Sequence, residues 1–490
     1  MKLKLLLYIF ILVFFSSCDD FLEEEPKDFL TPKNVKTEKD AEMMLLGTFS
    51  YYNTPDLYER SFYLLAEISS DQTIVKYTSG ALYEIDSYSH HSLSAHVKAV
   101  WRGLYQTINS ANFLINKVPD SNFSDDLKDR YIASGKFLRA LSYFHLVRLY
   151  GGVPLLTEAV ENFNSKEGIK RSSEVEVYQQ IISDLEYAER ILPVEEWNAY
   201  GKPTQGAAKT LLAKVYLTMA GYPINDDSMW EKAASKSKEV LGMVRYGLIE
   251  DVNDLWLIAK KNSKEHIFCI QNNTSLSSRS LMCVQSRPSG RSADGKKITE
   301  SGWAMWGSTI GFYNEFSNDD LRKSSSFCTE FQGVSYVNFP TKQPYIQKWI
   351  DDGREGEDYF QRNKRTNTNF PIFRYAEVLL INAEAENEAF GPTKVAYDPI
   401  NEVRNRAGLP DLDAGLSKDQ FRIALKKERS FELAFECKRR FDLVRWGDFE
   451  EVMSKDKYAG TFFESTHVLY PIPEGDIILN SNLEQNLGYE

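Results

Sequence analysis

The sequence predicts a mainly α-helical protein in which tetratricopeptide-like helical hairpins form a scaffold, with long irregular loops and little strand. Apolar residues recur at helical spacing, as in Trp101, Leu104, Tyr105 and Ile108. The segment around Leu212-Ala213, with Tyr216 three residues on, follows the first-helix pattern of a tetratricopeptide repeat, in which a small residue lets two helices approach.

Amphipathic segments pair into antiparallel hairpins in three regions, about 39–52, 94–246 and 370–446. Individual helices are expected at about 39–52, 94–118, 125–150, 172–191, 204–221, 228–246, 370–390, 395–407 and 418–446. The repeat periods are irregular, which predicts a degenerate solenoid rather than a regular array.

Residues 1–17 have the pattern of a lipoprotein signal peptide. Lys2 and Lys4 precede an apolar stretch that is too short to span a bilayer. The stretch ends at Cys18, whose thiol can be diacylated after cleavage, and two or three acyl chains anchor a protein stably. We therefore expect a lipid-anchored tether over residues 18–38 and a single domain over 39–490.

Composition and cysteine spacing exclude several classes of function. The net charge of −12 argues against nucleic acid as a partner, because phosphates require a basic face. Besides Cys18, the chain has Cys269, Cys283, Cys328 and Cys437, which lack the CxxC spacing of a metal site. The sequence is compatible with one disulfide among the first three, but their spacing does not tell which two would pair. His90-His91 and His96 indicate a helix entry with solvated histidines, since no partner for a metal accompanies them.

Calcium stays an open question. Asp319-Asp320 and Asp351-Asp352-Gly353 are rich in oxygen ligands, but neither has the spacing of an EF-hand. We predict no metal site and no cofactor.

Two loop-rich stretches, about 54–92 and 250–369, contain too many aromatic residues to be disordered and are expected to form the ligand-binding region. Trp303 and Trp306, at i and i+3 between glycines and serines, are expected to present two rings on one side. Tyr77 or Tyr83 from the earlier loop would complete this platform.

Arg287 and Arg291 are candidate hydrogen-bond donors to hydroxyl or carboxylate groups of a ligand. The structural alternatives are tryptophans that wedge the loop onto the helical body and a solvated basic loop.

The carboxylates near the C-terminus favour ion pairs rather than catalysis. Glu432, Glu436 and Asp442 lie three or four residues from arginines, which is the spacing of ion pairs on a helix. Glycosidase carboxylates must instead face each other across a sugar. No Walker loop, GxGxxG or GxSxG signature is present, so we expect no catalytic residues and no enzyme.

Four motifs together resemble the SusD/RagB family of Bacteroidetes outer-membrane lipoproteins. They are Arg148-Leu149-Tyr150-Gly151-Gly152-Val153-Pro154-Leu155, Arg374-Tyr375-Ala376-Glu377, the helix from Glu428 to Gly447, and the ending from Tyr470-Pro471-Ile472-Pro473 to Asn486-Leu487-Gly488-Tyr489. The chain departs from the family at Cys437, where Gly is common, and at Leu487, where Pro is common. Both departures concern local packing.

The resemblance implies a lipid-anchored outer-membrane protein that faces the extracellular side. Such a protein acts as a lid on a SusC-like TonB-dependent transporter, captures an oligosaccharide and delivers it for import. The alternatives are a peptide-capturing member of the same family, a surface glycoside hydrolase, and a repeat scaffold that binds only a protein partner.

Overall fold

The computed structural model describes residues 35–160, 168–195, 201–273, 280–290, 292, 295–298, 301–339, 341–350, 366–455 and 462–490. Cys18, the signal peptide and most of the tether lie outside these ranges, so the predictions made for them stay predictions. No helix in the described ranges has the length and apolar content needed to cross a bilayer.

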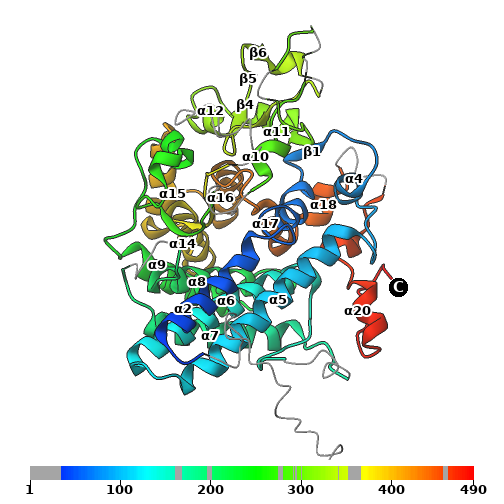
Figure 1. The fold of residues 1–490 in the computed structure, drawn as a ribbon. Coiled ribbons are helices and arrows are strands. Elements are labelled where there is room, and N and C mark those ends of the chain that lie inside the picture. The colour runs from blue at the N-terminus through cyan, green and yellow to red at the C-terminus, as the bar shows by residue number, and fades with distance from the viewer. Residues whose placement is uncertain are drawn as a thin grey trace, which may run out of the picture.

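Long helices build the body of the molecule, close to where the periodicity predicts them. They are α2 (Glu38–Ser50), α5 (Ala95–Lys117), α6 (Asp125–Tyr150), α7 (Glu174–Ile191), α8 (Gln205–Ala220), α9 (Met229–Leu241), α14 (Tyr375–Phe390), α15 (Lys394–Arg406) and α16 (Lys418–Glu432). Each of α5 to α9 packs on the next, and α9 packs on α14. This order confirms the predicted scaffold of helical hairpins, which fills one end of the molecule (Figure 1).

Local sequence explains where several of these helices begin. Thr37, Ser173 and Ser417 each form a capping box, in which the hydroxyl accepts from a backbone N–H that the helix leaves without a partner. The buried face of α5 carries Trp101 and Leu104, as its periodicity predicts.

The loop-rich stretches contain short helices and four two-stranded ladders. The helices are α3 (Ser61–Tyr63), α4 (Ala81–Asp86), α10 (Met282–Gln285), α11 (Ile310–Glu315) and α12 (Arg322–Ser326). The antiparallel ladders pair β1 (Thr73–Val75) with β3 (Trp306–Ser308), β2 (His266–Ile270) with β8 (Phe370–Arg374), β4 (Phe327–Cys328) with β7 (Tyr345–Ile346), and β5 (Glu330–Phe331) with β6 (Val334–Ser335). Figure 1 shows α10–α12 and β4–β6 together at the end opposite the long helices.

Two helix predictions are wrong in part. Residues 370–374 form strand β8, because this segment is buried at every position and bonds to β2. The helix predicted over 418–446 is divided into α16 and α17 (Arg439–Trp446), which α18 (Phe449–Met453) and α20 (Glu474–Leu479) follow. Phe435 and Cys437, with φ of 62° and 58°, take the left-handed conformation that ends a right-handed helix.

The break between α16 and α17 is held by a buried carboxyl group. The Cys437 N–H donates to Glu67 Oε2 at 2.6 Å, and the Glu67 side chain is fully buried. A glycine, expected here from the resemblance, would adopt this φ without the cost that a Cβ brings. Leu487, the second departure, is 71% exposed and disturbs no packing.

Motifs that lie far apart in the sequence meet in the fold. The Asn486 side chain donates from Nδ2 to the carbonyl oxygens of Tyr150 at 3.0 Å and Tyr470 at 2.7 Å. At Gly152 a Cβ would lie 2.4 Å from the Ser172 carbonyl oxygen, so no side chain fits. The glycines after α6 therefore allow the C-terminal segment and the start of α7 to close on this turn.

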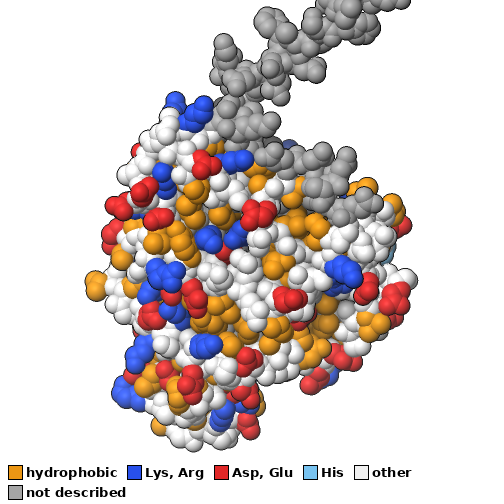
Figure 2. All heavy atoms as spheres, turned by 90° about the horizontal axis from the view of Figure 1, so that it is seen from below, with side chains coloured by type: hydrophobic (Ala, Val, Ile, Leu, Met, Phe, Trp, Pro, Cys, Tyr) orange, Lys and Arg blue, Asp and Glu red, His pale blue; other side chains and the backbone are white. Residues whose placement is uncertain are grey.

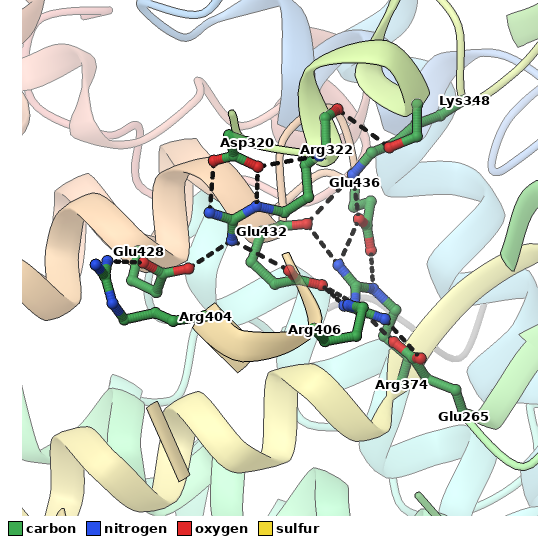
Figure 3. A network of polar contacts seen from close by, with 11 residues as sticks. Glu265, Asp320, Arg322, Lys348, Arg374, Arg404, Arg406, Glu428, Glu432 and Glu436 are labelled. Carbon is green, nitrogen blue, oxygen red and sulfur yellow. Dashed lines mark hydrogen bonds and ion pairs between the residues drawn. The ribbon is translucent and has the colours of Figure 1, made fainter. Parts of the chain in front are cut away.

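A buried network of ion pairs joins the loop-rich end to the helical body (Figure 3). At its centre the Glu432 carboxylate lies 2.5 Å from both Arg374 and Arg406 and 3.2 Å from Arg322. The network contains five cations and five carboxylates, namely Arg322, Lys348, Arg374, Arg404 and Arg406 with Glu265, Asp320, Glu428, Glu432 and Glu436.

Charge attraction outweighs burial at the centre of this network. Burial alone would raise the pKa of Glu432, but Arg406, Arg374 and Arg322 hold it well below its ordinary value. The carboxylate is therefore ionised, and it neutralises part of the positive charge of each of the three arginines.

Removing this shared charge should destabilise the protein strongly. We expect Glu432→Gln to lower the free energy of unfolding by about 3–5 kcal/mol, because it leaves buried arginines without a counter-charge. The exposed pair Lys394–Asp398 supplies the control, and Asp398→Asn should cost about 0.5 kcal/mol. Urea denaturation of both variants measures the difference, and equal losses would contradict a structural role for the network.

Glu67 should make stability depend on pH in the opposite direction from an ion-paired carboxylate. Burial raises the pKa of Glu67 to about 8, although the Cys437 N–H opposes the shift. Between about pH 4.5 and 8 the folded protein then holds a proton that the unfolded chain has lost, so stability falls as pH rises.

Glu67→Gln stays neutral throughout this range. Relative to wild type, its free energy of unfolding should rise by about 1.4 kcal/mol for each pH unit across the window. Denaturation at a series of pH values tests this, with the exposed Glu450→Gln as the control for loss of one carboxylate. Wild-type and Glu67→Gln profiles that run parallel would refute the assignment.

Candidate functional site

The ladder between β1 and β3 brings the two predicted loop regions together. Val75 lies opposite Trp306, and the Lys76 N–H donates to the Met305 carbonyl at 2.9 Å. The chain then leaves the ladder at Tyr77 on one side and at Trp303 on the other. Rings from residues more than 200 positions apart therefore come from the same end of one ladder.

The backbone around Trp303 is fixed on the turn that follows α10. The N–H groups of Trp303 and Met305 donate to the carbonyls of Val284 and Gln285 at 2.6 and 2.7 Å, and Gly302 and Ala304 donate to Pro288 and Arg287. At Gly302 a Cβ would approach the Val284 carbonyl oxygen to 2.6 Å. The glycine permits this close approach, and the four bonds hold the Trp303 backbone rigidly.

We call Lys76, Tyr77 and Trp303 the aromatic ledge. The Tyr77 side chain is 44% exposed and that of Trp303 is 38% exposed, so both offer ring surface to solvent. The Lys76 ammonium lies 5.6 Å from the centre of the Tyr77 ring. Such a surface can stack on an apolar ring face and donate hydrogen bonds from the ammonium group.

The predicted platform of two tryptophans does not form. Trp306 is fully buried, and its ring centre lies 6.2 Å from that of Tyr63. Trp306 is the first residue of β3, whereas residues 301–305 form no regular element and Ala304 is left-handed, with φ of 49°, so the helical spacing that would align the two rings is absent. For Trp306 the alternative holds, since the ring wedges the loop onto the core.

Arg287 also lies inside the protein rather than on the ligand surface. Its side chain is buried, and the guanidinium lies 5.3 Å from the Phe331 ring centre. Tyr83 is half-buried on α4, next to β1, and its predicted part in binding stays a prediction. Arg291 lies outside the described residues.

Lys76 was missed by the sequence reasoning, although it directly precedes Tyr77. Periodicity gives no signal for it, because a lysine in a Ser- and Thr-rich loop is ordinarily a solvated charge. Only the structure shows Lys76 beside the exposed Tyr77 ring, at the end of the ladder from which the Trp303 segment also leaves.

The carboxylates near the C-terminus that were considered as catalytic candidates are held in ion pairs. Glu432, Glu436 and Asp442 are buried and held by basic side chains. The predicted ion pairing is correct in kind, but only Asp442–Arg445 keeps the predicted partner, at 2.8 Å. The break between α16 and α17 turns the other carboxylates toward Arg374 and Lys348.

The four cysteines of the described residues are buried, and so are two of the three histidines at the helix entry, whereas His91 is exposed as predicted. His90 and His96 are buried rather than solvated, and burial lowers the pKa of His96 to about 4. His90 Nε2 forms a hydrogen bond with the Tyr489 hydroxyl at 2.8 Å. Cys269, Cys283, Cys328 and Cys437 are buried free thiols, so the disulfide left open by their spacing is not formed.

No group of three or more potential metal ligands occurs within the described ranges. Asp320 forms an ion pair with Arg322 at 2.8 Å, which occupies one of the carboxylates considered for calcium. Asp351 and Asp352 lie outside the described residues.

Comparisons with known proteins match both halves of the chain. A family model described as "SusD family" matches residues 332–489, and one described as "Starch-binding associating with outer membrane" matches residues 20–217. SusD-like protein P2 of Formosa agariphila is 28% identical over 515 residues, which cover 99% of each chain.

Solved structures agree with this match. The crystal structure of a SusD homolog from Bacteroides thetaiotaomicron has a TM-score of 0.82 and 29% identity, and covers 93% of this chain and 98% of that chain. A laminarin-binding SusD-like protein has a TM-score of 0.78 and 25% identity, with coverage of 93% and 100%.

The helical scaffold, with its loop-rich end, is therefore that of a SusD-like protein. The chain belongs to the SusD/RagB family.

The different burial of the two tryptophans is testable through stability. Trp306→Ala should lower the free energy of unfolding by about 3–5 kcal/mol, because it empties a filled core position. Trp303→Ala, which removes a partly exposed ring, should cost about 1 kcal/mol or less. Thermal and urea unfolding compare the pair, and a larger loss for Trp303→Ala would contradict the burial of Trp306 and the exposure of Trp303.

Proposed function

We propose that this protein captures oligosaccharides at the cell surface and delivers them to a SusC-like TonB-dependent transporter in the outer membrane, without chemistry of its own. The observation that carries the proposal is the aromatic ledge, in which two exposed rings and an ammonium group lie on a rigid backbone at the loop-rich end of a SusD-like scaffold.

Stacking on rings suits a sugar ligand for a physical reason. The C–H faces of a pyranose are apolar and flat enough to cover an aromatic ring, while its hydroxyls accept from an ammonium group such as Lys76. A sugar can displace water from this surface because it buries apolar area on the rings and also forms directional hydrogen bonds.

One solved structure and one family model guide the choice of glycan. A SusD-like protein with 25% identity is described as laminarin-binding, and the family model over the N-terminal half is described as starch-binding. Glucans with β- and α-linkages are therefore the first ligands to test on this chain. The ledge carries a lysine, which also suits an acidic sugar.

The membrane attachment forms part of the same proposal. Residues 1–17 would serve as the signal peptide, Cys18 would carry the acyl chains, and residues 18–38 would link the anchor to the domain over 39–490. A lipid anchor on the outer membrane keeps the captured ligand beside the transporter.

Figure 2 shows acidic and basic side chains interspersed on the face below the view of Figure 1, rather than a continuous basic surface.

Calorimetric titration of the soluble chain from Asp19 to Glu490 tests the proposal. The panel contains laminarin, starch, an acidic polysaccharide, their oligosaccharides and a peptide mixture, and each mixture is analysed for cleavage products. Saturable binding of a glycan without cleavage is the expected result. Peptide binding would favour the peptide-capturing alternative, and released sugar products would show an enzyme.

The ledge itself is tested by substituting its residues and titrating each variant with whichever glycan binds the wild-type protein. We expect Trp303→Ala and Tyr77→Ala each to weaken binding by roughly 5- to 150-fold, which corresponds to about 1–3 kcal/mol per stacked ring. Phe390→Ala, at a 56% exposed ring on the last residue of α14, is the matched control and should bind as wild type does. Unchanged affinity in both folded ledge variants would place the glycan site elsewhere.

A further inference from the structure

A second cluster of charges, separate from the network around Glu432, has more cations than carboxylates; its carboxylates are buried, while Arg148 and Lys214 are half-buried. Its carboxylates are Glu377, Glu384 and Asp442, and its cations are Arg148, Lys214, Arg429, Lys438 and Arg445. Glu377 is shared by Lys214 at 2.5 Å and Lys438 at 3.0 Å. Two positive charges therefore remain without a carboxylate of their own.

Arg148 is the clearest of these uncompensated cations. Its guanidinium lies 3.8 Å from the ring centres of both Phe144 and Phe441, and it donates to the Phe144 carbonyl and bonds to His145. None of the described residues supplies it with a carboxylate at ion-pair distance. Burial lowers the pKa of Arg148 to about 10, yet a guanidinium keeps its proton in a folded protein.

Arg429 adds a donor that points into the same region. Its Nε and Nη2 atoms donate to Asp442 at 3.1 and 3.0 Å, whereas its Nη1 atom is buried without a hydrogen-bond partner. The residue is only 2% exposed. A buried, charged donor without an acceptor is costly, so a missing acceptor is implied.

Space for an acceptor is present among these groups. Two small cavities, of about 20 and 10 Å³, share Arg148, Lys214, Lys438 and Phe441 in their walls, and Arg429 lines the smaller one. A cavity of about 10–15 Å³ or more holds one water molecule or a particle of similar size.

Glu436 and Cys437, which also line the larger cavity, do not supply a negative charge that could neutralise these cations. Glu436 is held by Arg374 and Lys348 at 2.7 Å each. Burial raises the pKa of Cys437 well above its ordinary value, so its thiol is neutral. Water would satisfy the hydrogen bonds of the cations but would leave their charge uncompensated.

We propose that these cavities hold a small monovalent anion, chloride or a close mimic, bound by Arg148, Lys214, Arg429 and Lys438. The anion supplies the counter-charge that the three carboxylates lack. It links α6, α8 and α16 to the start of α17, beside the break at Cys437. Arg148 and Lys438 lie in two of the motifs by which the family is known, and neither takes part in the aromatic ledge.

Anomalous scattering from crystals of the chain from Asp19 to Glu490 grown in sodium bromide tests the proposal directly. One bromide peak is expected in the cavity between Arg148 and Lys214. Absence of a peak there, in crystals that show ordered bromide elsewhere or none at all, would overturn the assignment.

A solution measurement gives an independent answer. The melting temperature should be higher in sodium chloride or bromide than in sodium gluconate of equal ionic strength, because gluconate is too large for the cavity. Lys214→Met should abolish this halide-dependent rise, whereas Lys209→Met, on the solvent side of the same helix and paired with Glu239, should retain it.

A rise that persists in Lys214→Met, or that is missing from wild type, contradicts a site in this cavity. If Lys214→Met does not fold, the bromide map of the wild-type protein decides alone.

Discussion

The Glu432 carboxylate, shared by three buried arginines, is the interaction on which the arrangement of this protein depends. It connects Arg322 of α12, in the loop-rich end, to Arg374 of β8 and Arg406 of α15 in the helical body. These ion pairs thereby fix the loop-rich end in one position relative to the helical body. A buried ion pair is poor support for stability in general, because desolvation offsets its attraction. Here its geometry makes the position of the loop-rich end specific.

The same network accounts for the many carboxylates near the C-terminus. Each of them compensates a buried cation, and an acid or base needs a carboxylate that a substrate can reach. At the aromatic ledge, the bonds from Gly302 to Met305 hold the backbone of a partly exposed tryptophan. Rigid placement of the ring reduces the entropy lost when a ligand stacks on it.

The two charge clusters differ in a way that neither sequence spacing nor composition indicates. Around Glu432 the cations and carboxylates are equal in number, whereas around Arg148 the cations outnumber the carboxylates. Both lie beside the left-handed residues Phe435 and Cys437, which end α16 and allow Glu436 and Lys438 to point in different directions. A continuous helix could not place these neighbours in two separate clusters.

The helical scaffold was readable from the sequence because amphipathic periodicity is local. The C-terminal ends of α6 and α14, predicted at residues 150 and 390, are observed, and a glycine follows each of them. The strand at 370–374 and the break at Cys437 could not be read in this way, since partners far along the chain, β2 and Glu67, determine them.

By itself, the sequence determined the class of the fold and the family motifs, and it proposed Trp303, Trp306, Tyr77, Tyr83 and Arg287 as candidate ligand residues. Only the tertiary structure decided that Trp306 and Arg287 are buried, that Lys76 lies beside the Tyr77 ring, and which carboxylate each arginine receives. The physical reason is that periodicity reports which face of one element is apolar. The pairing of β1 with β3 and of each charge with its partner depends on contacts between residues that the sequence places far apart.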